Sequence, residues 1–214
     1  MSLKISDLET GVGELRLSVR ALDVESGKVA CVMGKSGSGK STLLGAIAGF
    51  VPATGTIEVS GRRVDGLAPE KRGTAMIFQS LSLFPNMSVA GNVEFALKVR
   101  GVPRAERRRR ALEWLERLGI APLADRASTA ISGGEAQRVA FARALIAGTP
   151  VLLLDEPFGA LDDENRANLR AVLKDLVRET GVAALLVTHD RADVEALADR
   201  LYRLEWGQVV EAKL

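Results

Sequence analysis

The stretch that most constrains the fold runs from Lys28 to Phe50 and places a glycine-rich turn between two apolar segments. The run 29–33 is typical of a buried strand, and the segment after the turn has Ala, Leu and Ile at helical spacing. The turn matches G-x-x-x-x-G-K-[ST], beginning at Gly34. A strand, a glycine turn and a helix in this order predict a loop whose backbone N–H groups bind an anion.

The residue types in this turn favour a nucleoside triphosphate site over an ordinary glycine turn that binds nothing. We expect Gly34, Gly37 and Gly39 to adopt backbone conformations closed to other residues. Lys40 is expected to reach the outer phosphates, and the Ser41 hydroxyl is expected to face Mg²⁺. The residues predicted to bind the nucleotide form one stretch: Gly34, Lys35, Ser36, Gly37, Ser38, Gly39, Lys40, Ser41 and Thr42.

Composition excludes several classes of protein. With 214 residues, 47% of them hydrophobic, the chain suits one domain with a real core. Lys and Arg number 29 against 27 acidic residues, so no overall charge favours nucleic acid, and the run 107–110 is interpreted as a solvated helix face. The single cysteine, Cys31, suits a reducing compartment and a core position.

Membrane and targeting signals are weak in this sequence. No apolar run approaches the roughly 20 residues that a membrane-spanning helix needs. The N-terminus alternates polar and apolar residues and does not resemble a secretory signal. We therefore expect any membrane role to come through a partner.

Two kinds of segment follow one another along the chain. Residues 1–27 alternate in the manner of antiparallel strands. From about 89 to 126 the pattern is helical, which predicts an inserted helical subdomain. Apolar strands at 151–154 and 182–187, separated by a helix at 163–180, indicate a parallel sheet covered on both faces. Ligands on such sheets lie at the carboxyl ends of the strands.

Polar residues terminate the predicted strands of this sheet. Asp155 is predicted to hold Mg²⁺, and Glu156 to act as a general base on the attacking water; the alternative is an acidic pair that caps a helix. His189, the only histidine, follows another strand and is predicted to contact the γ-phosphate, although a lone histidine is more often structural. Gln79 ends a third strand, and its amide could face Mg²⁺ or the water.

A second glycine segment, Ser132-Gly133-Gly134, precedes a predicted helix at 135–146 and forms a second candidate anion site. One chain already has a phosphate loop, so we expect this segment to serve the nucleotide of another copy. Two chains would then face each other head to tail and enclose two ATP molecules. The alternative is an ordinary capped helix start.

Taken together, these motifs resemble those of the ATP-binding cassette (ABC) ATPases over essentially the whole chain. The segment that most separates this family from other phosphate-loop proteins is the Ser-Gly-Gly signature. The stretch after Gln79 is similar to that of bacterial importer ATPases of the mineral, organic-ion and thiamine type. The motifs occur in family order: the phosphate loop at 34–42, the glutamine loop at Gln79, the signature at 131–138, the strand V-L-L-L-D-E-P at 151–157, A-L-D at 160–162 and the histidine switch at His189.

This resemblance implies a fold: an α/β P-loop NTPase with a RecA-like core, an N-terminal antiparallel β subdomain and an inserted α-helical subdomain. The predicted single ABC ATPase domain spans 1–214, with the core and β subdomain at 1–85 and 127–214 and the helical subdomain at 86–126. The extra regulatory domain of many importer ATPases is expected to be absent, since the chain ends soon after Trp206.

The resemblance also implies roles for individual residues. Those expected to act in catalysis are Glu156, His189, Gln79 and Lys40. Those expected to hold Mg²⁺ are Ser41, Gln79 and Asp155. The signature residues Ser132, Gly133, Gly134 and Glu135 are expected to complete the partner's site, and Asp162 to link the two sites of the dimer.

Four departures from the family pattern stand out. Ile131 replaces the usual leucine of the signature, and Glu135 stands where glutamine is commoner. Lys35 takes a position often held by proline. No aromatic residue precedes Phe50, so we expect Val12 or a neighbour to contact the adenine in place of a stacking ring.

The leading hypothesis is an ATP-hydrolysing subunit of a bacterial ABC membrane transporter, which we expect to be an importer. It would use ATP and Mg²⁺, work as a homodimer on transmembrane permease subunits at the cytoplasmic face of the cell membrane, and bind no nucleic acid. An extracytoplasmic substrate-binding protein is a further possible partner. The alternatives are an ABC exporter ATPase, a soluble ABC ATPase, and a nucleotide-binding scaffold without turnover.

Overall fold

The computed structural model describes residues 1–159 and 161–214. These divide into two compact units. Unit 1 comprises residues 1–76, 149–156 and 170–214, and unit 2 comprises residues 77–148 and 157–169. Unit 2 contains the whole segment predicted as a helical subdomain and extends beyond it on both sides. The predicted boundaries themselves stay a prediction.

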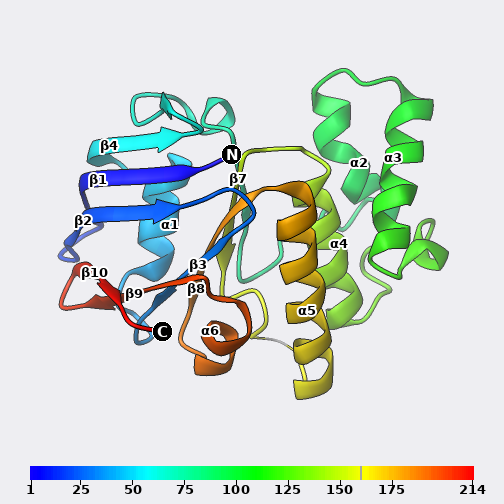
Figure 1. The fold of residues 1–214 in the computed structure, drawn as a ribbon. Helices are drawn as coiled ribbons and strands as arrows, with labels where there is room; N and C mark the ends of the chain where they lie inside the picture. The colour runs from blue at the N-terminus through cyan, green and yellow to red at the C-terminus, as the bar shows by residue number, and fades with distance from the viewer. Residues whose placement is uncertain (160) are drawn as a thin grey trace. The chain divides into compact units, whose positions relative to one another are not determined.

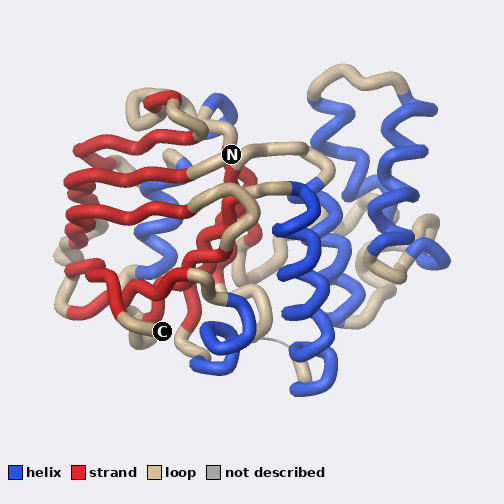
Figure 2. Tube along the Cα trace, in the orientation of Figure 1, coloured by secondary structure: helices blue, strands red, loops and turns tan. Residues whose placement is uncertain are grey.

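Unit 1 is built on one mixed sheet (Figures 1 and 2). The sheet has ten strands in the order β5-β4-β1-β2-β10-β9-β3-β8-β7-β6. The bounds of the strands are β1 Leu3–Thr10, β2 Leu17–Val24, β3 Val29–Met33, β4 Ala53–Val59, β5 Arg62–Arg63, β6 Thr74–Ile77, β7 Val151–Asp155, β8 Ala183–Thr188, β9 Arg200–Glu205 and β10 Gln208–Ala212.

The central strands of this sheet are parallel and apolar, as predicted. Strand β8 pairs in parallel with both β3 and β7. Its six residues are all buried, and so are all five of β7. A strand covered on both faces needs such a continuous apolar sequence. The registers Met33↔Thr188 and Asp155↔Val187 bring the carboxyl ends of the three strands to one edge.

The N-terminal strands confirm the predicted antiparallel part of the sheet. Strand β1 pairs in antiparallel fashion with β2 and with β4. Leu3 and Ile5 are buried and so, after a one-residue register shift between Ser6 and Glu9, are Leu8 and Thr10, while the residues between them are exposed. This period of two places one face of each strand against the core and the other in solvent.

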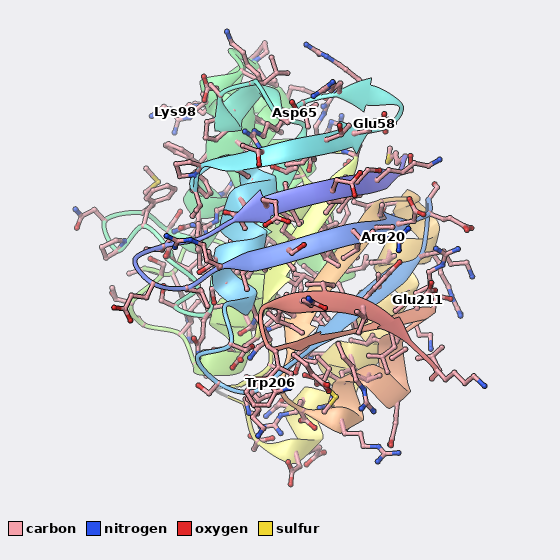
Figure 3. The ribbon with its side chains drawn as sticks, turned by 90° about the vertical axis from the view of Figure 1, so that its left-hand side faces the viewer. Arg20, Glu58, Asp65, Lys98, Trp206 and Glu211 are labelled. Atoms are coloured by element: carbon pink, nitrogen blue, oxygen red, sulfur yellow. The ribbon has the colours of Figure 1, made fainter. Side chains whose placement is uncertain are left out.

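The hairpin of β9 and β10 was not predicted. Strand β9 inserts between β3 and β10, and β10 pairs in parallel with β2, so the hairpin joins the parallel and antiparallel parts of the sheet. Figure 3 shows Trp206 at the turn of this hairpin, and Arg20 and Glu211 on the neighbouring strands β2 and β10. Trp206 has a positive φ of 51° and a fully exposed side chain.

Two helices of unit 1 pack on this sheet. Helix α1 (Lys40–Ala48) contacts β1, β7 and β8, and α6 (Arg191–Leu197) contacts β3 and β8. Leu43, Leu44 and Ile47 of α1 are fully buried in the main core cluster. Cys31 is buried in β3, as expected for a core position, and burial raises the pKa of its thiol far above the usual range. It is therefore a packing residue.

Unit 2 is a cluster of helices. Helices α2 (Val89–Val99), α3 (Arg104–Arg117) and α4 (Gly133–Leu145) contact one another in pairs. Short 3-10 turns occupy Ala121–Leu123 here and Pro69–Lys71 in unit 1. Helix α5 (Asp163–Thr180) begins in unit 2 and continues into unit 1 at Arg170.

The basic run of α3 is only in part the solvated helix face that was predicted. Arg107 and Arg108 are half-buried and pair with Glu94 of α2, whereas Arg109 and Arg110 are exposed. Arg109 pairs with Glu106 and Glu113, and Arg110 also pairs with Glu106, within one helix. Such exposed pairs at three- and four-residue spacing are common on surface helices and add little stability. Within the described residues, no helix is both long enough and apolar enough to cross a membrane.

Candidate functional site

The phosphate loop, residues 34–39, lies between β3 and α1. Gly37 and Gly39 have positive φ angles of 76° and 100°, which confirms the predicted need for glycine at both positions. Gly34 needs glycine for a different reason from the one predicted. Its φ is not positive; instead a Cβ there would lie 2.8 Å from Ser38 Oγ, which is too close.

Lys40 lies across this loop at the start of α1. Its Nζ donates hydrogen bonds to the carbonyl oxygens of Gly34 and Lys35, each at 2.9 Å, and lies 3.3 Å from Glu156 Oε1. The side chain is only 4% exposed. The loop therefore holds a buried ammonium group whose partners are two carbonyls and one carboxylate.

Ser41 and Asp155 meet beside this lysine. The Ser41 hydroxyl is close enough to the Asp155 carboxylate to affect its pKa. Burial raises the pKa of Asp155 and the charge of Glu156 raises it further, while the Ser41 hydroxyl and the charge of Lys40 partly lower it. Two oxygen donors, one of them a carboxylate whose burial disfavours its own charge, fit a hard divalent cation such as Mg²⁺.

Glu156 is the centre of the site. It follows β7 with a positive φ of 44°, and its N–H donates to the carbonyl oxygen of Val187 at 3.0 Å. A positive φ at a residue other than glycine costs free energy and is found disproportionately at functional positions. Its carboxylate lies between Lys40 at 3.3 Å and His189 Nδ1, which is 3.1 Å from Oε2.

His189 follows β8 and leaves most of its ring in solvent. Its side chain is 61% exposed, whereas that of Glu156 is 16% exposed. With Nδ1 facing the carboxylate, Nε2 remains on the solvent side, where it can meet a ligand. Lys40, Glu156 and His189 therefore form a row of cation, carboxylate and imidazole along the carboxyl edge of the sheet.

A cavity of about 700 Å³ opens beside this row within unit 1. Its walls include Lys35 and Ser38 of the phosphate loop, His189, and Trp206 of the β9–β10 turn. Loop, histidine and exposed aromatic ring thus border the same space.

The signature segment, Ser132–Glu135, lies in unit 2 at the start of α4. Ser132 Oγ accepts from the Glu135 N–H at 3.4 Å, and Glu135 Oε2 accepts from the Ser132 N–H at 2.7 Å. These two bonds make a capping box. The backbone and side chain of Ser132 lower the pKa of Glu135. The capped-helix alternative is therefore part of the structure, and the role toward a partner's nucleotide stays a prediction.

Gln79 also lies in unit 2, exposed to solvent just after β6. The next residues are held by neighbours that were not predicted. Arg143 donates to the carbonyl oxygens of Leu81 and Ser82, both of which have positive φ. The buried Asn92 exchanges two hydrogen bonds with the backbone of Phe84. This segment is thus fixed by side chains of unit 2.

Asp162 precedes α5 in unit 2. Its carboxylate accepts from the backbone and side-chain nitrogens of Asn165 at 2.9 and 2.8 Å, and these bonds lower its pKa. Ala160 of the motif 160–162 lies outside the described residues. The geometry makes Asp162 a helix cap, and its coupling role between protomers stays a prediction.

The structure therefore brings together, in unit 1, the predicted residues of the phosphate loop with Lys40, Ser41, Asp155, Glu156 and His189. Two residues near His189 were missed: Arg170 and Asp193. The sequence signal that could have found them is Asp193, an acidic residue four positions after the histidine and in the first turn of a helix. A carboxylate that is buried there needs a cationic partner.

Comparison with known proteins gives a consistent result. A family model described as "ABC transporter" matches residues 17–159. An Fe(3+) ions import ATP-binding protein of Streptomyces avermitilis is 43% identical over 99% of this chain and 61% of its own length. An sn-glycerol-3-phosphate import ATP-binding protein of Rhizobium johnstonii is 46% identical over 88% of this chain and 51% of its own length.

A third relative is a molybdate/tungstate import ATP-binding protein of Thermococcus kodakarensis, 43% identical over 99% of this chain and 64% of its own length. The chain thus spans about half to two thirds of the length of these curated relatives. Among solved structures, the dimeric post-hydrolysis state of the ATP-binding cassette MJ0796 bound to ADP and Pi matches with a TM-score of 0.83 and 31% identity. That match covers 99% of this chain and 98% of the other.

Proposed function

The chain belongs to the ABC transporter family, and on this premise we propose that it is the ATP-hydrolysing subunit of a membrane transporter. Its substrate would be ATP and its cofactor Mg²⁺. The observation that carries the proposal is the position of Glu156, held between Lys40 and His189 at the carboxyl edge of the sheet. The family membership supports the transport function, and the row of Lys40, Glu156 and His189 supports the hydrolysis of ATP.

Glu156 is the proposed general base. A carboxylate next to the phosphate loop can take a proton from a water that attacks the terminal phosphate. Lys40 forms an ion pair with this carboxylate in the ligand-free chain, and its three N–H donors suit phosphate oxygens equally well. Binding of a triphosphate would therefore exchange the contact of Lys40 with Glu156 for contacts with phosphate, leaving the base free to act.

His189 is proposed to position the terminal phosphate relative to Glu156. Its Nδ1 faces Glu156, so Nε2 is free to meet the terminal phosphate. Ser41 and Asp155 are the residues of unit 1 that would hold Mg²⁺, which neutralises charge on the outer phosphates. Gln79 would add its amide oxygen to this set, as the family resemblance implies.

The dimer follows from the same proposal. The signature segment of a second copy would close the site from the other side, and Asp162 would couple the two sites. The similar cassette MJ0796 has been solved as a dimer with ADP and Pi, which supports this arrangement. Relatives named for import of Fe(3+), sn-glycerol-3-phosphate and molybdate or tungstate support an importer.

The membrane partners are part of the proposal. Transmembrane permease subunits would bind the dimer at the cytoplasmic face of the cell membrane, and an extracytoplasmic binding protein would deliver the cargo. The three named relatives differ in cargo while sharing 43–46% identity with this chain. We infer that cargo choice resides in the membrane subunits and the binding protein.

Phosphate release by the purified chain tests the enzymatic part. We expect the wild-type chain to hydrolyse MgATP and Glu156→Gln to lose at least about 100-fold in kcat, since a positioned general base contributes about 10²–10⁴-fold. The matched control is Glu179→Gln, a change of the same kind in helix α5, which should keep wild-type turnover. Near-normal hydrolysis by Glu156→Gln would remove Glu156 from the base role.

Co-purification tests the transport part. We expect the chain to be recovered with permease subunits from detergent-solubilised membranes. Recovery with ribosomes or DNA in place of membrane proteins would favour a soluble ABC ATPase and contradict the proposal.

A further inference from the structure

A polar network that the proposed catalytic row does not include lies directly behind His189. It is formed by Arg170 of α5, Thr188 at the end of β8, and Asp190 and Asp193 at the start of α6, all in unit 1. Thr188 and Asp193 are almost fully buried, and the Arg170 side chain is only 11% exposed. Such buried charged groups are costly unless their partners are well placed.

The network fixes the backbone on both sides of the histidine. Thr188 Oγ1 donates to Asp193 Oδ2 at 2.5 Å and accepts from the Asp190 N–H at 3.0 Å. Asp190 caps α6, because its Oδ1 accepts from the Ala192 N–H at 2.9 Å. The residue before His189 and the residue after it are therefore joined to each other and to the first turn of α6.

Arg170 closes the network from the neighbouring helix. Its Nε donates to Asp193 Oδ1 at 2.7 Å, and its terminal nitrogen reaches Asp190 Oδ2 at 3.0 Å and Asp193 Oδ1 at 2.5 Å. One planar guanidinium thus bridges two carboxylates that would otherwise repel each other. Lysine has no such fork and would contact the two carboxylates less well.

The histidine itself depends on this support. The side chain of His189 is 61% exposed, so packing does little to orient its ring, and Glu156 is its polar partner at 3.1 Å. Its position relative to Glu156 is then determined mainly by the backbone of 188–190. We propose that Arg170 is a positioning residue that holds His189 against Glu156, an inference that rests on the proposed ATPase function.

Without Arg170, the carboxylates of Asp190 and Asp193 would lose the cation that they share. Asp193 is almost fully buried, so an unpaired charge there would be relieved by movement of the first turn of α6 away from Asp190. This movement would carry His189 with it. A displacement of about 1 Å in a catalytic constellation can reduce turnover by about 100-fold.

Turnover of Arg170→Met is the first half of the test. We expect kcat for ATP to fall by about 10- to 100-fold while KM changes by less than about threefold, because the phosphate loop is not altered. Arg170→Lys should recover part of the loss, since it restores charge without the fork. Two control variants are measured with Arg170→Met. Arg191→Met breaks an exposed ion pair with Glu195 within helix α6, and Leu173→Ala destabilises α5 without changing a residue of the network.

The second half is spectroscopic and does not depend on hydrolysis. His189 is the only histidine, so its imidazole gives a single set of NMR resonances. Glu156→Gln should displace these resonances in the chain that keeps Arg170. In the Arg170→Met chain the same substitution should displace them by less than half as much.

The outcomes separate the two proposals. If the wild-type chain hydrolyses no ATP, the proposed function fails, yet the NMR comparison still tests the positioning role. If Arg170→Met keeps wild-type kcat, or loses no more of it than Leu173→Ala, or leaves the response of His189 to Glu156→Gln unchanged, the positioning role is wrong. Should Arg170→Met fail to fold, Arg170→Lys serves in both measurements.

Discussion

The N-cap residue of helix α1 is Gly39, which has no side chain to cap the helix, whereas that of helix α4 is Ser132, which takes part in a capping box. The first-turn N–H groups of α1 therefore remain for an external anion, with Lys40 beside them. In α4 the chain supplies its own anion, since the Glu135 carboxylate accepts from the Ser132 N–H. Both helix ends attract negative charge, but only the first is open.

The difference between the uncapped start of α1 and the capped start of α4 affects how both could bind one triphosphate. In the ligand-free chain, the open end in unit 1 already has beside it Lys40, the proposed Mg²⁺ ligands Ser41 and Asp155, and the proposed base Glu156. The capped end in unit 2 uses the N–H of Glu135 for its cap, while those of Gly133 and Gly134 are not part of it. We infer that the first end binds the nucleotide and that the second joins afterwards.

The largest effect is expected at the open end. Lys40→Ala should weaken MgATP binding by about 10- to 100-fold, because hydrogen bonds to charged groups contribute about 1.5–3 kcal/mol each. Calorimetric titration measures it. Lys28→Ala, at the other end of β3, removes an exposed lysine paired with Asp199 and should bind ATP normally. Equal affinity of Lys40→Ala and wild type would mean that the open end is not the nucleotide site.

The next effect concerns the capped end. Ser132→Ala should lower the free energy of unfolding by about 1 kcal/mol, the usual cost of losing a side-chain cap. Denaturant titration measures this change. MgATP affinity of the isolated protomer should stay at the wild-type level, since unit 1 is untouched. A loss of affinity as large as that of Lys40→Ala would erase the distinction between the two ends.

Asp155→Asn should stabilise the nucleotide-free chain at neutral pH. The pKa of Asp155 is raised in the folded state, so folded protein binds more protons than unfolded protein just above the ordinary pKa. The free energy of unfolding therefore falls as pH rises through that window, and the cost persists at pH 7. Thermal melts should show a higher Tm for the variant at pH 7 and no gain below about pH 4. A lower Tm at pH 7 would contradict this account of the charge.

The smallest effect is expected for Glu135→Gln. The pKa of Glu135 is lowered in the folded state, so its ionised carboxylate stabilises the fold above the ordinary glutamate pKa. This stabilisation is lost as pH falls through the lowered pKa. The variant keeps a polar cap and should lose only a few tenths of a kcal/mol at pH 7. Melts across pH should show this difference vanish in acid. A difference that grows in acid would refute the charged cap.

Much of unit 1 could be predicted because the types of its residues depend directly on their burial and backbone conformation. Continuous apolar runs in β7 and β8 require burial on both faces, and the glycines of 34–39 require a special backbone. Asp155 was found because it ends a buried strand, and Glu156 and His189 because each directly follows one. The hairpin at 200–212 was missed, since its short strands alternate weakly and its pairing with β2 and β3 joins segments far apart in sequence.

The supporting residues were harder to predict for a physical reason. Arg170 and Arg143 lie on amphipathic helices, where an arginine is usually a solvated residue. Their partners are decided by tertiary packing: two aspartates at the start of α6 for Arg170, and two loop carbonyls after Gln79 for Arg143. The sequence next to each arginine does not distinguish such a buried fork from an exposed one; for Arg170 the signal lies at Asp193, 23 positions away.

We propose that one triphosphate joins the open end of α1 to the capped end of α4 from a second copy. The most direct measurement is disulfide crosslinking of Lys35→Cys with Ile131→Cys in a Glu156→Gln, Cys31→Ala chain. We expect a crosslinked dimer with MgATP and little of it with MgADP or without nucleotide. Equal crosslinking in all three conditions, or none with MgATP while the nucleotide is bound, would contradict the account.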